Sequence, residues 1–126
     1  MKSNLGKVLL VVLALGSFSP LALADDAAAA MSIAAILVDM NHFPSDEGKA
    51  TLHAITEDAS VSADLKAIAL AVHNVQHAAT ADDKAALGMI VSSDMASTEA
   101  KALAEIVAGF NHMPSEDAKA SLQAML

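Results

Sequence analysis

One stretch of the chain, Ile36–Ile55, has the sequence ILVDMNHFPSDEGKATLHAI, and it returns seventy residues later as IVAGFNHMPSEDAKASLQAM at Ile106–Met125. Nine of the twenty aligned positions are identical. Half of that spacing locates a weaker middle copy, so that the same residue types recur every 35 positions. A period of this length is typical of stacked supersecondary units. The recurring residues include His42, His77 and His112; Lys49, Lys84 and Lys119; and Leu52, Leu87 and Leu122.

Each copy has the pattern of a helical hairpin. Apolar residues at helical spacing form a first helix that stops at an Asn-His or Gln-His pair, and Pro44 or Pro114 prevents its continuation. Ser45, Thr80 and Ser115 then stand where the N-cap of a second helix belongs, with acidic residues in its first turn. The sequence therefore predicts an all-α fold of three tandem ~35-residue helix-hairpin repeats, with six short helices.

The three units are expected at about residues 27–61, 62–96 and 97–126. A short α-solenoid and a compact helical bundle would both bury their apolar faces, and the sequence does not separate the two. The residues expected to maintain the repeat are His42, Pro44, Ser45, Lys49, Leu52, His77, Thr80, Lys84, Leu87, His112, Pro114, Ser115, Lys119 and Leu122.

Residues 1–24 have the three parts of a secretory signal peptide. Lys2 and Lys7 precede an apolar run over residues 8–15, and Ala22-Leu23-Ala24 supplies the small residues of a cleavage site. The apolar run is shorter than the roughly 20 residues that cross a bilayer. We therefore expect a periplasmic or secreted protein whose mature single domain is residues 25–126, with no membrane segment after cleavage.

The composition excludes several classes of function. The 126 residues include 15 acids, 7 lysines, no arginine and no cysteine. Without cysteine the chain cannot form a disulfide framework, a thiolate zinc site or an iron–sulfur cluster. A net charge of −8 argues against a nucleic-acid partner or an anionic membrane surface. Phosphate-binding and nucleophile motifs are missing as well, so we do not expect an enzyme.

Histidine is the residue type that points most directly to a ligand. His73 and His77 lie four positions apart, where they would share one face of a helix and could bind a single zinc, copper or nickel ion. His42 and His112 are further candidate ligands. A solvated helix face without any ligand is the alternative for the pair.

The recurrence of His42, His77 and His112 also has a structural explanation. A histidine at the end of a helix can complement the helix dipole and bond its last free carbonyl groups. If successive hairpins stack side by side, equivalent side chains lie on the order of 20 Å apart, too far to share one ion. Methionine beside histidine would favour copper(I), but other apolar residues replace Met40 and Met113 in the other copies, which favours packing.

Two functions from different classes stand ahead of a third, a pH- or stress-responsive chaperone, which nothing in the sequence favours over them. The first is a protein- or peptide-binding scaffold without a cofactor, because stacked hairpins present extended surfaces. The second is a periplasmic metal-binding protein that uses His, Met and acidic side chains to hold a divalent transition metal or copper(I). Apolar residues on the last helix, Leu122, Met125 and Leu126, would also allow a homo-oligomer.

Overall fold

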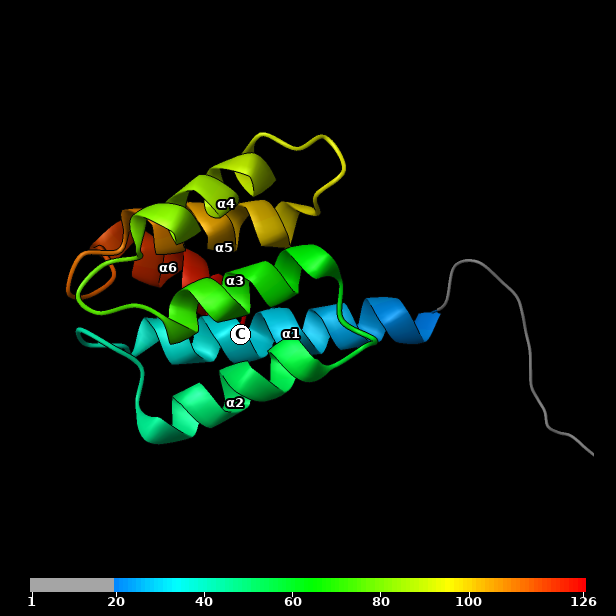
Figure 1. The fold of residues 1–126 in the computed structure, drawn as a ribbon, viewed down its shortest axis with the longest axis horizontal. Coiled ribbons are helices and arrows are strands. Elements are labelled where there is room, and N and C mark those ends of the chain that lie inside the picture. The colour runs from blue at the N-terminus through cyan, green and yellow to red at the C-terminus, as the bar shows by residue number, and fades with distance from the viewer. Residues whose placement is uncertain (1–19) are drawn as a thin grey trace, which may run out of the picture.

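A computed structural model describes the backbone of residues 20–126 and the side chains of residues 25–126. The described part of the chain contains six helices and no strand beyond isolated bridges, as Figure 1 shows. The predicted all-α class and the number of helices are therefore confirmed. The helices are α1 (Pro20–Val38), α2 (Asp46–Glu57), α3 (Ala63–His73), α4 (Ala81–Val91), α5 (Thr98–Gly109) and α6 (Glu116–Ala124).

Five of the helices begin at a hydroxyl residue that caps them. The Thr80 side chain, for example, accepts a hydrogen bond from the backbone N–H of Asp83 at 3.1 Å, which satisfies one of the free donors of the first turn. The N-caps predicted at Ser45, Thr80 and Ser115 are thus confirmed, and α3 and α5 are capped in the same way. The five N-cap residues are Ser45, Ser62, Thr80, Ser97 and Ser115.

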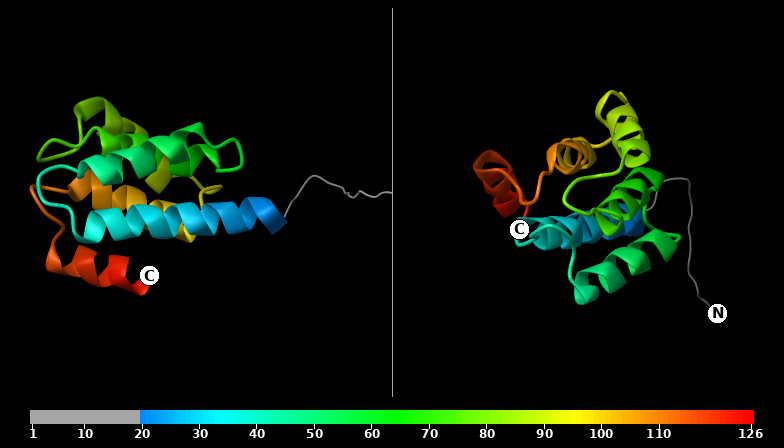
Figure 2. Two further views of the ribbon diagram at one scale, coloured as in Figure 1. Left: turned by 90° about the horizontal axis from the view of Figure 1, so that it is seen from below. Right: turned by 60° about the vertical axis from the view of Figure 1, so that its left-hand side comes forward.

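The helices form an inner set of three and an outer set of three. Three of them, α1, α3 and α5, contact one another, and the other three lie outside them (Figure 2). Helix α2 packs against α3, α4 packs against α5, and α6 packs against α1. The last helix of the chain therefore lies against the first.

Leucine and alanine recur at equivalent buried positions of the core. Leu52, Leu87 and Leu122, one from each outer helix, are completely buried. Ala34, Ala69 and Ala104 are equally buried on the three inner helices. Because alanine adds only a methyl group, the inner helices can approach closely along these positions. The loops that follow the inner helices are thereby brought to one end of the molecule, at the left of Figure 1.

The predicted signal peptide lies largely outside the described residues and stays a prediction. In the described part of the chain α1 starts at Pro20, before the predicted cleavage site after Ala24. None of the helices described here combines the length and the apolar character that crossing a membrane requires.

Candidate metal centre

Three loops of the same kind follow the inner helices and connect α1 to α2, α3 to α4 and α5 to α6. Helices α1, α3 and α5 end at Val38, His73 and Gly109, three or four residues before the recurring histidine. The prediction that this histidine ends the helix is therefore wrong. The chain instead leaves the helix earlier and reaches the histidine in an irregular loop. The corresponding loop triplets are Asn41-His42-Phe43, Gln76-His77-Ala78 and Asn111-His112-Met113.

The backbone of all three histidines is in an uncommon conformation. The φ angles of His42, His77 and His112 are +72°, +72° and +67°, and these are the described non-glycine residues with positive φ. Such a conformation costs an L-residue roughly 1–2 kcal/mol, although histidine adopts it more readily than most residues. Backbone strain of this kind persists only where the surrounding structure imposes it, and it is concentrated at functional sites.

Local hydrogen bonds make the turn tight in two of the loops. The N–H of Phe43 donates to the carbonyl oxygen of Asn41 at 2.9 Å, and the N–H of Met113 donates to that of Asn111 at 2.7 Å. A bond across three residues with positive φ at the centre is the pattern of a strained γ-turn. The histidine therefore stands at the apex of its turn.

A closed ring of backbone hydrogen bonds joins the three apices. The N–H of His42 donates to the carbonyl of His112, that of His77 to the carbonyl of His42, and that of His112 to the carbonyl of His77, at 2.5, 2.6 and 2.6 Å. Each histidine is thus donor to one neighbour and acceptor from the other. This ring holds together three loops that are far apart in the sequence, and it supports the positive φ angles.

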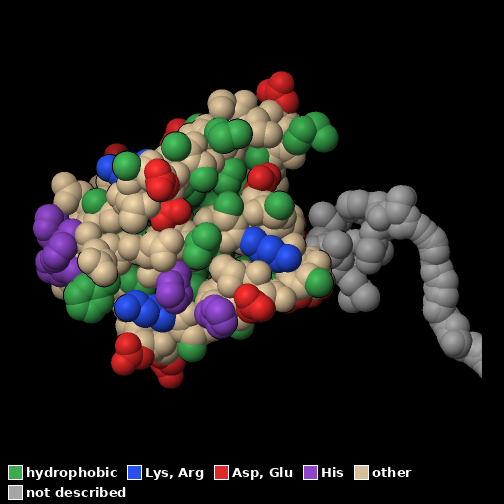
Figure 3. Space-filling model, in the orientation of Figure 1, with side chains coloured by type: hydrophobic (Ala, Val, Ile, Leu, Met, Phe, Trp, Pro, Cys, Tyr) green, Lys and Arg blue, Asp and Glu red, His purple; other side chains and the backbone are tan. Residues whose placement is uncertain are grey.

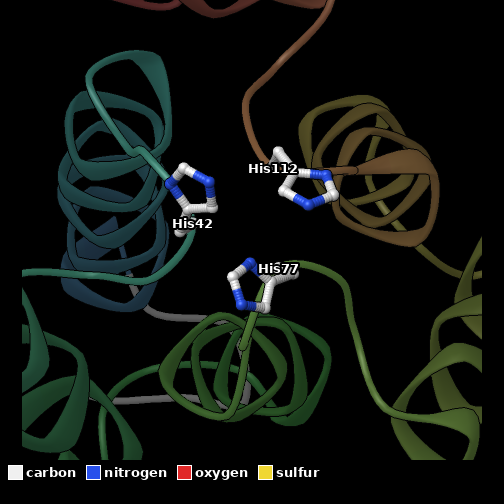
Figure 4. Close-up of side chains that lie close together, drawn as sticks. All are labelled: His42, His77 and His112. Atoms are coloured by element: carbon white, nitrogen blue, oxygen red, sulfur yellow. The ribbon is translucent and has the colours of Figure 1, made fainter.

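The three imidazole rings gather around one point (Figure 4). Their centroids lie 4.9, 5.1 and 5.0 Å apart, and one ligating nitrogen from each ring lies within 4.8 Å of the other two. His42 is half-buried, whereas His77 and His112 are exposed. Figure 3 shows histidine side chains gathered on the surface at this end of the molecule. The cluster is therefore accessible from solvent.

The spacing is close to what a shared ion requires. Zinc binds imidazole nitrogen at about 2.0–2.1 Å, so three nitrogens on a tetrahedral ion lie roughly 3.3 Å apart. Nitrogens that lie up to 4.8 Å apart need to approach one another by up to about 1.5 Å, which rotations of the side-chain torsions can supply. The backbone ring already fixes where these side chains start.

One histidine has its ring orientation set by a neighbour. Nδ1 of His112 lies 2.6 Å from the side-chain oxygen Oδ1 of Asn111. Because an amide oxygen can only accept, Nδ1 is the donor in this contact, and Nε2 is the nitrogen left to bind a metal ion. Metal-bound histidines usually donate their other N–H in this way, which orients the ring and makes it a better ligand.

The structure brings together a different set of histidines from the pair predicted first. His73 and His77 do not share a helix face, because α3 ends at His73 and His77 lies beyond it with positive φ. His42 and His112, the further candidates, join His77 instead. The estimate of about 20 Å between equivalent histidines is also wrong, because it assumed hairpins stacked in a line, whereas here the last helix packs against the first.

The other residues of the expected repeat lie around this end or in the core. Pro44 and Pro114 are buried where the loops turn into α2 and α6. Lys49 and Lys119 are half-buried, and Lys84 is exposed. Among the methionines, Met40 packs in the core as expected, but half of Met113 is exposed, so that packing does not account for it.

Comparisons with known proteins identify no relative of this chain. No family model matches the sequence, and neither a curated protein nor a solved structure matches it. The geometry of the three histidines is therefore the main guide to function.

Proposed function

We propose that the protein binds one divalent transition-metal ion through His42, His77 and His112. The observation that carries this proposal is the convergence of three imidazole nitrogens within 4.8 Å from three separate loops. The ring of backbone hydrogen bonds prepares the site before any ion arrives, so that little ordering is needed on binding. The net charge of −8 also favours the approach of a cation.

The ligand type narrows the choice of ion. Imidazole suits zinc, copper, nickel and cobalt, whereas calcium and magnesium prefer oxygen ligands. Sites made of the same ligands generally bind Cu²⁺ more tightly than Ni²⁺ or Zn²⁺. We therefore expect all three ions to bind, with copper the tightest in direct competition.

We further propose that the chain consists of three copies of one helix-hairpin unit in a closed, compact bundle. The packing of α6 against α1 supports closure, because the two ends of an open stack would lie apart. The 35-residue spacing of structurally equivalent residues supports the three copies. These residues are the buried Ala34, Ala69 and Ala104, the buried Leu52, Leu87 and Leu122, and the three histidines with positive φ.

Metal binding now stands ahead of the protein-binding scaffold as the better-supported function. Two similar surface hollows do occur, one beside Ile36 and Glu47 and the other beside Ile106 and Asp117. They are open hollows between helices that follow one another in the chain, α1 and α2 in one case and α5 and α6 in the other, and they carry no chemistry that selects a partner. The scaffold function and the export of the protein stay predictions.

Calorimetric titration of the purified, metal-free protein with Zn²⁺, Ni²⁺ and Cu²⁺ tests the proposal. We expect one ion per chain with micromolar or tighter affinity, and loss of that binding in the triple variant His42→Asn/His77→Asn/His112→Asn. Asparagine is chosen because it tolerates positive φ, so the variant keeps its turns.

The two histidines outside the cluster provide matched controls. His53→Asn and His73→Asn each remove one imidazole and should leave the affinity unchanged. Unaltered binding in the triple variant would refute the three-histidine site, and loss of binding in His73→Asn would restore the His73/His77 pair.

A further inference from the structure

We propose that the ion held by the three histidines keeps one coordination position open to solvent, and that a small exchangeable anion can occupy it. This inference rests on the proposed metal site and concerns what that site does once it is loaded. The ligand at the open position would be a monodentate anion, such as azide, which replaces water.

The count of protein ligands supports an open position. The cluster of potential ligands among the described His, Cys, Asp and Glu residues comprises three imidazoles and no carboxylate. Closed structural zinc sites have four protein ligands, whereas three protein ligands leave a fourth position for water or another small molecule. The missing ligand must then come from outside the cluster.

The direction of the open position follows from the exposure of the histidine side chains. The N–H and carbonyl groups of His42, His77 and His112 are engaged with one another in the hydrogen-bonded ring. The side chains of His77 and His112 are exposed, and that of His42 is half-buried. The surface view in Figure 3 likewise shows histidine side chains on the outside of the molecule. The remaining position of the ion therefore faces solvent.

Charge selects the kind of ligand. Three neutral imidazoles leave the full charge of a divalent ion uncompensated, and no carboxylate belongs to the described cluster. A bound cation is then the largest local charge and attracts an anion at short range. The negative net charge of the chain acts at longer range and is screened by salt, so a small monoanion is better suited than a bulky or multiply charged one.

Azide titration of the cobalt-loaded protein tests this inference. Co²⁺ serves as the probe because its visible absorption reports ligand type and geometry. We expect cobalt to bind one per chain with bands typical of nitrogen ligands, and azide to change those bands in a saturable way in the millimolar range. His73→Asn should show the same response, and sodium perchlorate at equal ionic strength should show none.

The possible results separate the two proposals. If the protein takes up no cobalt, the metal site itself is wrong. If cobalt binds but its spectrum ignores azide, the metal site stands and the open position is refuted. If cobalt doubles the mass in sedimentation and the spectrum ignores azide, a second copy of the chain fills the position, which also overturns this inference.

Discussion

At the scale of single residues, the histidines at positive φ combine a conformational cost with a role as ligands. His42, His77 and His112 adopt a backbone conformation that glycine would adopt without strain, yet each position has an imidazole. The packing of the loops does not require the ring itself, because His77 and His112 are exposed. Metal binding would explain why the side chain is present where the backbone favours glycine.

Replacing His77 by glycine should therefore stabilise the metal-free protein while weakening metal binding. Relief of the positive φ angle is expected to raise the free energy of unfolding by up to about 1 kcal/mol, less than the full strain because glycine gains freedom in the unfolded chain. Urea unfolding followed by circular dichroism measures the stability, and titration with Zn²⁺ measures the affinity.

The same substitution in a helix provides the control. His53 lies in α2, where glycine should lower the free energy of unfolding by roughly 0.5–1 kcal/mol and leave Zn²⁺ binding intact. Equal destabilisation by His53→Gly and His77→Gly would show that positive φ carries no strain at His77.

At the scale of helices and their connections, side chains at the ends of the helices decide where each one starts and stops. The turn between α2 and α3 shows this most clearly. Asp58, the C-cap of α2, accepts hydrogen bonds from the hydroxyl of Ser60 at 2.6 Å and from the backbone N–H of Ser60 at 2.9 Å. These bonds, the hydroxyl first, lower the pKa of the Asp58 carboxyl below its ordinary value, and the charge of Lys66 adds to the effect.

A carboxyl with a lowered pKa in the folded state stabilises the fold only while it is ionised. The contribution of Asp58 should be complete above the pKa that this group has in the unfolded chain, and it should disappear as the pH falls through the folded value. We expect Asp58→Asn to be less stable than the natural protein at pH 7 and equally stable once the carboxyl is protonated. Urea unfolding at a series of pH values, from pH 7 down to the pH at which the carboxyl is protonated, measures the difference in the free energy of unfolding.

Asp94→Asn supplies the comparison, because Asp94 is an exposed acid in the connection between α4 and α5. It should show a smaller loss of stability at pH 7. If the loss of stability in Asp58→Asn stayed constant down to the lowest pH of the series, packing of the turn rather than the ionised carboxylate would be responsible.

At the scale of the whole molecule, the sequence predicts the helices and their caps better than it predicts the site. Thr80 and the buried Leu87 are specified by local patterns, namely a hydroxyl before acids and an apolar period of helical length. The meeting of His42 with His112 depends instead on the return of α6 to α1, which no local pattern encodes. The equal spacing of the three histidines is the signal that could have located the site, had a closed arrangement been assumed.

The metal ion should stabilise the whole bundle, because it joins three loops, and each loop connects two of the six helices. A ligand that binds only the folded state adds about 2.7 kcal/mol at a free concentration one hundred times its dissociation constant. For a domain of about 100 residues that corresponds to a rise in Tm of about 10 °C or more. Scanning calorimetry with and without Zn²⁺ measures the shift, and the triple variant His42→Asn/His77→Asn/His112→Asn should show none. Because the backbone ring already holds the loops, the metal-free protein should still unfold cooperatively; a protein that folded only with zinc would contradict a preformed site.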